Sequence, residues 1–399
     1  MFLDALFLGL GYNASLVTLG ATALGVAAGV TGTFLYLRKR SLVADAISHA
    51  TLPGIALAFL AAVALGLDAR NLPLLLAGSA VSAGAGLLAV QWLAVQTRLS
   101  EDAAIGAVLS VFFGFGVVLL TLIQTLDVGG QAGLEDFLLG STAGMVRSEA
   151  LLVAAGGLLA LLAVVLLRRP MLMGAFDPAY AAAQGINLNR TDIAMMGLVM
   201  AVTVVGLKIV GLILIVALLI IPPVAARFWS DRADRVIVMS GAMGGAAGWI
   251  GAALSASAAD LPTGPVIVLV AFAMFAVSFF LAPGRGLLAA AIRRATFRNK
   301  VHLRQGLLAL AHDQPIYEAL TLRLLARRNW VRADGVATEA GQVASSRARL
   351  DEERWGIVRS DPSFELAAAR YDGLTPIEAV LTEDQIAEID LALPKPEPL

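Results

Sequence analysis

Nine apolar segments, each close to the length that crosses a lipid bilayer, constrain the fold of this chain more than any other feature. A helix needs about 20 predominantly apolar residues to cross the hydrocarbon core. Because backbone groups in lipid must be hydrogen-bonded within the protein, such segments are expected to be helices. The prediction is an all-α polytopic membrane protein with about nine transmembrane helices. The predicted spans lie at about 14–36, 46–67, 72–96, 103–126, 150–167, 192–207, 209–226, 236–258 and 264–283.

The composition agrees with a membrane protein and excludes several chemistries. Hydrophobic residues make up 58% of the chain and charged residues 15%, whereas charged residues are about 25% of an ordinary globular protein. Since there is no cysteine, disulfides, thiolate metal sites and thiol nucleophiles are excluded. No lysine lies in a G-x-x-x-x-G-K-[ST] phosphate-binding loop. If transport by this chain is powered by ATP, another polypeptide must therefore hydrolyse it.

Basic residues fall mostly on one side of the predicted spans, which indicates the orientation of the chain. Cytoplasmic loops of membrane proteins are enriched in lysine and arginine. An N-terminus outside and a C-terminus in the cytoplasm leave only Arg70, Arg147 and Lys208 on the outer side. The same orientation places these basic residues inside: Arg38, Lys39, Arg40, Arg98, Arg168, Arg169, Arg190, Arg227, Arg232, Arg235 and Arg285.

Glycines recur at four-residue spacing in two of the predicted spans. The pairs are Gly25–Gly29 in the first span and Gly241–Gly245 and Gly244–Gly248 in the eighth. Small residues at this spacing let two helices approach closely in lipid, where no hydrophobic effect drives association. They predict close helix packing but carry no information about a substrate.

The composition changes after Arg285, where the chain becomes charged. We therefore predict two domains, a transmembrane domain at 1–285 and a cytoplasmic extension at 286–399. Helical patterns at about 287–312 and 316–329 precede a glycine-centred turn, and a further helix follows it.

Asp45 and His49 are the strongest candidates for chemistry within a span. On a helix they share one face, one turn apart, and a carboxylate at this depth costs roughly 2.5–3.5 kcal/mol on insertion scales. An aspartate and a histidine can together chelate a divalent transition metal, although a structural zinc site needs four ligands. An Asp–His hydrogen bond that joins two helices explains the same spacing. Pro53 and Gly54 are expected to interrupt this helix.

Two loops offer further candidates. Asp177 is a suitable N-cap, Pro178 a suitable first helical residue and Gly185 a suitable end for a short helix at 178–184. This helix is either a plain connector or a protruding helix that docks into a partner. Glu135 and Asp136, in a loop on the outer side, either attract incoming cations or are simply solvated.

Taken together, these stretches resemble the membrane permease of the zinc/manganese/iron family of ATP-binding-cassette (ABC) importers. The similar pieces run in family order across about 1–285, and ADAISHATLPG is the most specific of them. They are LRKRSLVADAISHATLPG, SEDAAIGAVLSVFFGFG, LEDFLLGS, FDPAYAAAQGIN, VGLILIVALLIIPPVAARF and PTGPVIVLVA.

The resemblance implies a multi-pass protein of the bacterial inner membrane, in which Asp45 and His49 line the translocation path and contact the metal. It implies a dimer with a second permease protomer, identical or related, two cytoplasmic ATPases and an extracytoplasmic metal-binding protein. No cofactor is bound permanently, since the divalent metal (manganese, zinc or ferrous iron) is the substrate. A coupling helix within 177–187 is implied to meet the ATPase, through Asp177, Pro178, Ala179, Tyr180, Gln184 and Gly185.

The cytoplasmic extension resembles a winged helix of metal-dependent repressors of the diphtheria-toxin-repressor type. The similarity lies in the helix–helix–GVATEAGQ–helix order. Acidic stretches at 351–353 and 383–390 argue against nucleic-acid binding. We expect a regulatory or structural role for the extension.

Two other functions are compatible with the residues. In a secondary, proton-coupled metal transporter, Asp45 and His49 form a proton relay. In a membrane-tethered metal sensor, the extension acts and the spans only anchor it. Nine spans are more than anchoring needs.

Overall fold

The computed structural model describes residues 2–9, 11–68, 71–126, 146–258 and 261–393, with the backbone alone for 2, 208–210 and 212–214. The chain divides into two compact units, Met1–Leu288 and Ala289–Leu399. The first unit contains the apolar segments and the second contains the charged extension.

Eight helices in the described part of the first unit are long and apolar enough to cross a membrane, which confirms most of the predicted spans. They are α2 (Tyr12–Leu37), α3 (Ser41–Ala64), α4 (Leu72–Gln96), α5 (Glu101–Gln124), α7 (Arg147–Phe176), α9 (Leu188–Val210), α11 (Ala233–Ala256) and α12 (Thr263–Leu281). Two short helices, α1 (Phe2–Leu6) and α8 (Pro178–Ala183), lie outside the spans.

The seventh predicted span, at about 209–226, corresponds to α10 (Leu212–Arg227), which has only 16 residues. At 1.5 Å per residue it extends about 24 Å, less than the roughly 30 Å of hydrocarbon that a span must cross. It is separated from α9 by Gly211, whose φ of 80° lies in the left-handed region. The apolar run from 192 to 226 therefore forms one full-length helix and one short helix.

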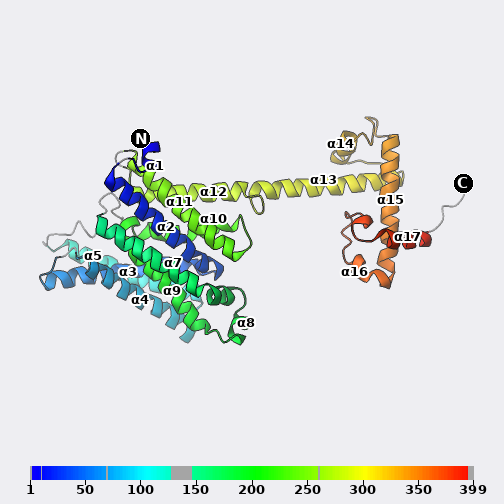
Figure 1. Cartoon of the computed structure of the whole chain (residues 1–399). Coiled ribbons are helices and arrows are strands. Elements are labelled where there is room, and N and C mark those ends of the chain that lie inside the picture. Colours follow the sequence, from blue (N-terminus) through cyan, green and yellow to red (C-terminus); the bar gives the residue numbers. More distant parts are fainter. Residues whose placement is uncertain (1, 10, 69–70, 127–145, 259–260, 394–399) are drawn as a thin grey trace, which may run out of the picture. The chain divides into compact units, whose positions relative to one another are not determined.

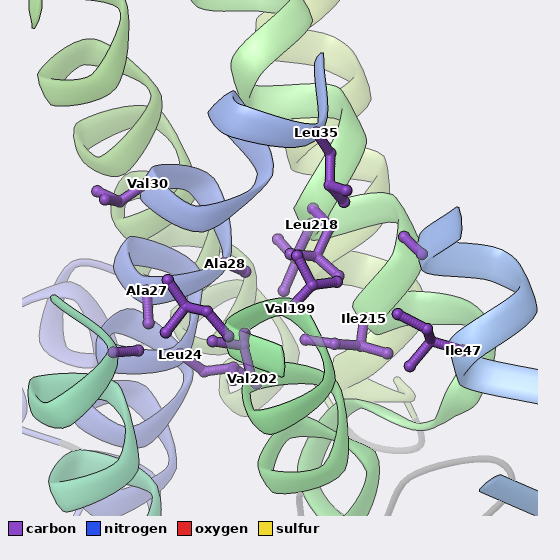
Figure 2. Close-up of a cluster of buried hydrophobic side chains, with 14 of the residues drawn as sticks. Leu24, Ala27, Ala28, Val30, Leu35, Ile47, Val199, Val202, Ile215 and Leu218 are labelled. Carbon is purple, nitrogen blue, oxygen red and sulfur yellow. The ribbon is translucent and has the colours of Figure 1, made fainter. Parts of the chain in front are cut away.

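The core of the membrane unit lies around α2, which packs along α11, α7 and α10 (Figure 1). Figure 2 shows the buried side chains that α2, α3, α9 and α10 contribute to this core. Those labelled are Leu24, Ala27, Ala28, Val30, Leu35, Ile47, Val199, Val202, Ile215 and Leu218.

The predicted glycine positions bring α2 and α11 into backbone contact. A Cβ atom on Gly25 would collide with the carbonyl of Gly244, and one on Gly29 would collide with that of Ser240. The Ser240 hydroxyl donates to the carbonyl oxygen of Gly29 at 2.6 Å. Close packing by small residues, predicted from the sequence, is thus present between these two helices.

The α3 helix runs unbroken from Ser41 to Ala64 with Pro53 inside it, so the expected interruption at Pro53 and Gly54 is wrong. The prolyl ring packs beside Gly116 of α5, and a Cβ atom on Gly54 would collide with the carbonyl of Gly78 of α4. Neighbouring helices thus support the helix at the proline, as they do in other membrane proteins. These contacts hold α3 between α4 and α5.

The second unit is helical in its described part. Its small core consists of Trp355, Val358, Ile377, Leu381 and Ile389. Its elements are α13 (Leu287–Ala311), α14 (Ala319–Arg327), α15 (Glu339–Ser360), η1 (Pro362–Phe364), α16 (Glu365–Ala368), η2 (Ile377–Ala379) and α17 (Glu383–Ala392). The first of these begins two residues before the boundary between the units.

The winged-helix likeness of the extension is not shown by this structure. A winged helix carries a β-hairpin, whereas the described residues of the extension contain no strand. The turn around Gly335 is closed by one isolated antiparallel bridge between Val331 and Ala337. A single bridge pairs too few residues to form a hairpin ladder.

Candidate functional site

Asp45 and His49 lie one turn apart on α3, as their spacing predicts. The Nε2 atom of His49 is 3.4 Å from Oδ1 of Asp45, and the two side chains are 20% and 40% exposed respectively. Most of α3 is buried, so these two polar side chains lie partly exposed on a helix that is mainly enclosed by the protein. The carboxylate has free lone pairs that can bind a cation.

The imidazole of His49 is held by an aromatic contact and leaves one nitrogen without a partner. Its ring meets the ring of Phe113 of α5 edge to face, with centroids 5.0 Å apart. Its Nδ1 atom is buried and has no hydrogen-bond partner in the described part of the chain. Buried polar atoms are rarely left unsatisfied unless the site has a function. Both polar groups of the pair therefore have unused capacity to bind a ligand.

The pair does not form a complete metal site within one chain. Among the described residues, no group of three or more His, Asp or Glu side chains is placed to hold a metal ion. Transition metals of the zinc and manganese class take at least four ligands. The two side chains of this pair are therefore too few to complete such a site, and Asp45 is 40% exposed.

An ion-pair network that the sequence did not predict joins five helices near the start of α3. Asp192 of α9 pairs with Arg38 at the end of α2 and with Arg40 at the N-cap of α3, the latter at 3.2 Å. Arg40 also pairs with Glu101 of α5 at 2.8 Å. Arg38 donates to the carbonyl oxygen of Gly174 of α7 at 2.6 Å. The four charged side chains are between 16% and 35% exposed, so water weakens these pairs only in part.

The short helix between α7 and α9 has the predicted caps. Oδ1 of Asp177 accepts a hydrogen bond from the backbone N–H of Tyr180 at 2.9 Å, and Gly185 has a φ of 80°. The helix α8 spans Pro178–Ala183, one residue shorter than predicted. Only Ala181 is buried, and the exposed residues include all six candidates, Asp177, Pro178, Ala179, Tyr180, Gln184 and Gly185. Nearly all of the surface of α8 is therefore exposed in this chain.

The candidate outer-side residues Glu135 and Asp136 lie outside the described residues.

Comparisons with known proteins show which family and which proteins the chain is similar to. The family model described as "ABC 3 transport family" matches residues 13–282. The chain is 39% identical over 298 residues to the manganese transport system membrane protein MntC of Bacillus subtilis, covering 75% of this chain and 67% of that protein. It is 38% identical over 277 residues to the zinc transport system membrane protein TroC of Treponema pallidum, covering 69% and 91%.

Two solved structures resemble the membrane unit. The structure of PsaBC from Streptococcus pneumoniae in complex with Fab matches with a TM-score of 0.61 and 29% identity, covering 71% of this chain and 96% of that one. An inward-facing structure of a putative metal-chelate type ABC transporter matches with a TM-score of 0.51 and 16% identity, covering 66% and 84%. At that identity the second match concerns the fold alone.

Proposed function

Since the chain belongs to the ABC 3 transport family and is the membrane permease subunit of an ABC metal importer, we propose that the metal crosses the membrane by way of Asp45 and His49. A permease of this kind is a transport component and not an enzyme, and it is a multi-pass protein of the bacterial inner membrane. It works with an ATPase and a substrate-binding protein. The proton-coupled transporter and the tethered sensor are therefore disfavoured.

The observation that carries this proposal is the unused ligand capacity of the pair. Nε2 of His49 faces Oδ1 of Asp45 at 3.4 Å, too long for a strong hydrogen bond, and Asp45 is 40% exposed. Among the described residues Nδ1 of His49 has no hydrogen-bond partner either. Carboxylate and imidazole are the donors that manganese and zinc share. A passing cation would also offset the cost of the carboxylate within the span. Two ligands bind weakly, which suits a site that must release its cargo.

We propose that a second permease protomer, identical or related, completes the ligand set. Two copies of the Asp45–His49 pair facing each other would supply four donors, the number that zinc prefers. The α5 helix beside His49 exposes the ring of Phe113 by 42%. On the same face of α5, seven residues earlier, a Cβ atom at Gly106 would meet no atom of the described residues within 4 Å. This face of α5 therefore has room for another helix.

The proposed route from the ATPase to the metal pair begins at α8 and passes through the ion-pair network. The exposed surface of α8 is the proposed docking site for the ATPase, at the end of the unit that the basic residues indicate is cytoplasmic. Asp192 follows α8 along the chain, and Gly174 precedes it. Arg38 holds both, and Arg40 connects Asp192 to the start of α3, five residues before Asp45. A displacement of α8 would in this way pull on the helix that holds the metal ligands.

The proposed cargo is manganese or zinc. Relatives named as manganese and zinc transport proteins match with almost the same identity, 39% and 38%. Ferrous iron is compatible with the same donors. For the extension we propose a regulatory or structural role.

Reconstitution with the ATPase tests the proposal. Asp45→Ala and His49→Ala should each reduce ATP-dependent uptake of manganese, zinc or iron into vesicles by at least tenfold. Asp102→Ala and His312→Ala, which change exposed residues of the same types elsewhere, should leave uptake unchanged. Wild-type uptake by both pair variants for every cation would disprove the assignment of the pathway. Uptake that persists without ATP would instead favour the proton-coupled transporter.

A further inference from the structure

A strongly basic pocket of about 360 Å³ lies where α10 ends, α11 begins and α12 ends. Arg227 closes α10, Arg232 and Arg235 begin α11, and Arg285 follows α12. Asp231 is the one acidic residue among the described lining, so four arginines against one aspartate leave a formal charge of +3. The charge on the lining is therefore suited to an anion.

The acidic residue of the pocket is already shared, which leaves two arginines without a counter-ion. Oδ1 of Asp231 pairs with Arg227 at 3.2 Å and also with Arg285. Arg232 and Arg235 make no ion pair within the described part of the chain. Arg232 is also the N-cap of α11 and forms no side-chain cap, so the first amides of α11 add a partial positive charge at the same place.

The pocket adjoins an apolar surface of the kind that faces lipid. The indole of Trp229 lines the pocket, donates to the hydroxyl of Ser278 at 2.9 Å and remains 41% exposed. Next to it α12 exposes Val277, Phe280 and Leu281, each by more than half. Tryptophan and arginine at the ends of spans are typical of the membrane interface, where head groups lie. The anion site and an apolar strip are thus continuous.

We propose that this pocket binds the phosphate of an anionic phospholipid, with the acyl chains along the exposed face of α12. Arginine binds phosphate oxygens in a planar, bidentate geometry, and basic pockets between transmembrane helices recognise anionic head groups on the cytoplasmic side. A free phosphate ion offers the same oxygens to the arginines. The adjoining apolar strip of α12 favours the lipid, because it would have no role for a soluble anion. This inference is independent of the path that the metal takes.

Lipid retention by the full chain, measured by native mass spectrometry, tests the proposal. Wild type should retain phosphatidylglycerol in preference to phosphatidylcholine. Each arginine near an anionic surface contributes a factor of about five, equivalent to about 1 kcal/mol. Arg232→Gln/Arg235→Gln should therefore weaken retention of phosphatidylglycerol about 25-fold. Arg98→Gln/Arg190→Gln, a matched double change at the same end but outside the pocket, should leave it unchanged.

Two further arms identify the ligand and guard against misfolding. Asp231→Asn raises the charge of the lining, so it should strengthen retention, which damage to the fold would not do. Inorganic phosphate at 10 mM should neither displace phosphatidylglycerol nor raise the melting temperature of the wild type. Equal retention of the two lipids, or equal losses in the two arginine double variants, would overturn the proposal. Displacement by inorganic phosphate would overturn it in favour of a soluble-anion site.

Discussion

Arg40, at the N-cap of α3, and Asp192, near the start of α9, form an ion pair at 3.2 Å across 152 residues of sequence. The pair connects the helix that carries Asp45 and His49 to the helix that directly follows α8. Arg38 binds the same carboxylate from the end of α2. A single aspartate thus connects α2, α3 and α9 near the proposed metal ligands.

Replacing Asp192 should uncouple ATP hydrolysis from transport. Asp192→Asn leaves the guanidinium of Arg38 without a counter-ion, whereas Arg40 keeps its pair with Glu101. It removes about 2 kcal/mol of charge-assisted hydrogen bonding. We expect about tenfold fewer metal ions transported per ATP hydrolysed, measured in vesicles with the reconstituted ATPase. Asp234→Asn is the matched control, because Asp234 pairs with Arg168 at 3.4 Å and is 63% exposed. Equal stoichiometries for the two variants would contradict the role of the network.

Phe113 should position the imidazole of His49. Phe113→Leu removes the edge-to-face contact, which is worth about 0.5–1.5 kcal/mol. We therefore expect the metal concentration at half-maximal uptake to rise between twofold and tenfold with little change in the maximal rate. Phe115→Leu changes an exposed phenylalanine of the same helix and should have no such effect. Phe113→Tyr, which keeps the ring, should restore the wild-type value.

The surface of α8 should determine ATPase binding. Tyr180 is 53% exposed, and docking of α8 onto the ATPase would remove a negative charge at this position from water, at a cost in free energy. Tyr180→Asp should abolish co-purification of the ATPase while the permease remains folded. Tyr317→Asp in the extension, where the tyrosine is 90% exposed, serves as the comparison. Loss of the ATPase from both variants would show that α8 is not the specific contact.

The contact between α2 and α11 should not tolerate a single added methyl group at its centre. Gly25→Ala places a Cβ atom against the backbone of Gly244, and overpacking of this kind costs about 1–3 kcal/mol. The melting temperature in detergent should fall by several degrees. Gly197→Ala, at a position where a Cβ atom meets nothing within 4 Å, should leave it unchanged or raise it slightly. A similar decrease in both variants would indicate that helix packing is not responsible.

The extension should lose one stabilising ion pair in acid. Arg354 binds both oxygens of Asp390, at 2.7 and 2.6 Å, and this hydrogen bonding holds the pKa of the Asp390 carboxyl below its usual range. A lowered pKa means that the stabilisation is present above the ordinary aspartate pKa of about 3.9 and disappears as the pH falls through the lower, folded value. Because the pair is partly exposed, it contributes less than about 1 kcal/mol.

Hydrogen exchange in α15 and α17 of the full chain measures this effect. Asp390→Asn should exchange faster than wild type at pH 7 and at pH 5, and the difference should shrink as the pH falls below the ordinary aspartate pKa. A difference that grows as the pH falls would contradict a lowered pKa of Asp390 in the folded protein.

Properties that depend on neighbouring residues could be predicted from the sequence. The spacing of Asp45 and His49 places them on one helical face, and Asp177, Pro178 and Gly185 define the short helix almost to the residue. The apolar runs identify the spans for the same reason, since hydropathy reports local contact with lipid. In each case the controlling interaction lies within one or two helical turns.

Properties that depend on distant contacts could not be predicted. Asp192 and Arg38 are 154 residues apart. From the sequence, the basic residues around Arg38 indicate only which side of the membrane they lie on. The continuity of α3 through Pro53 depends on α4 and α5 packing around it, which local propensity does not include. The shortness of α10 results from the backbone angle at Gly211. Asp192, an acidic residue near the start of α9, is the sequence feature that could have indicated the network.

The backbone of α2 lies directly against that of α11 at Gly25 and Gly29, so neither helix can slide past the other without a steric clash. Any rearrangement that opens the permease to one side and then the other must therefore move these two helices together as one rigid body. The α3 helix is likewise fixed near its middle, by the close approaches of Gly54 to Gly78 of α4 and of Gly116 of α5 to Pro53. The proposed metal ligand His49 lies about one turn before Pro53, so it would move together with α3, α4 and α5.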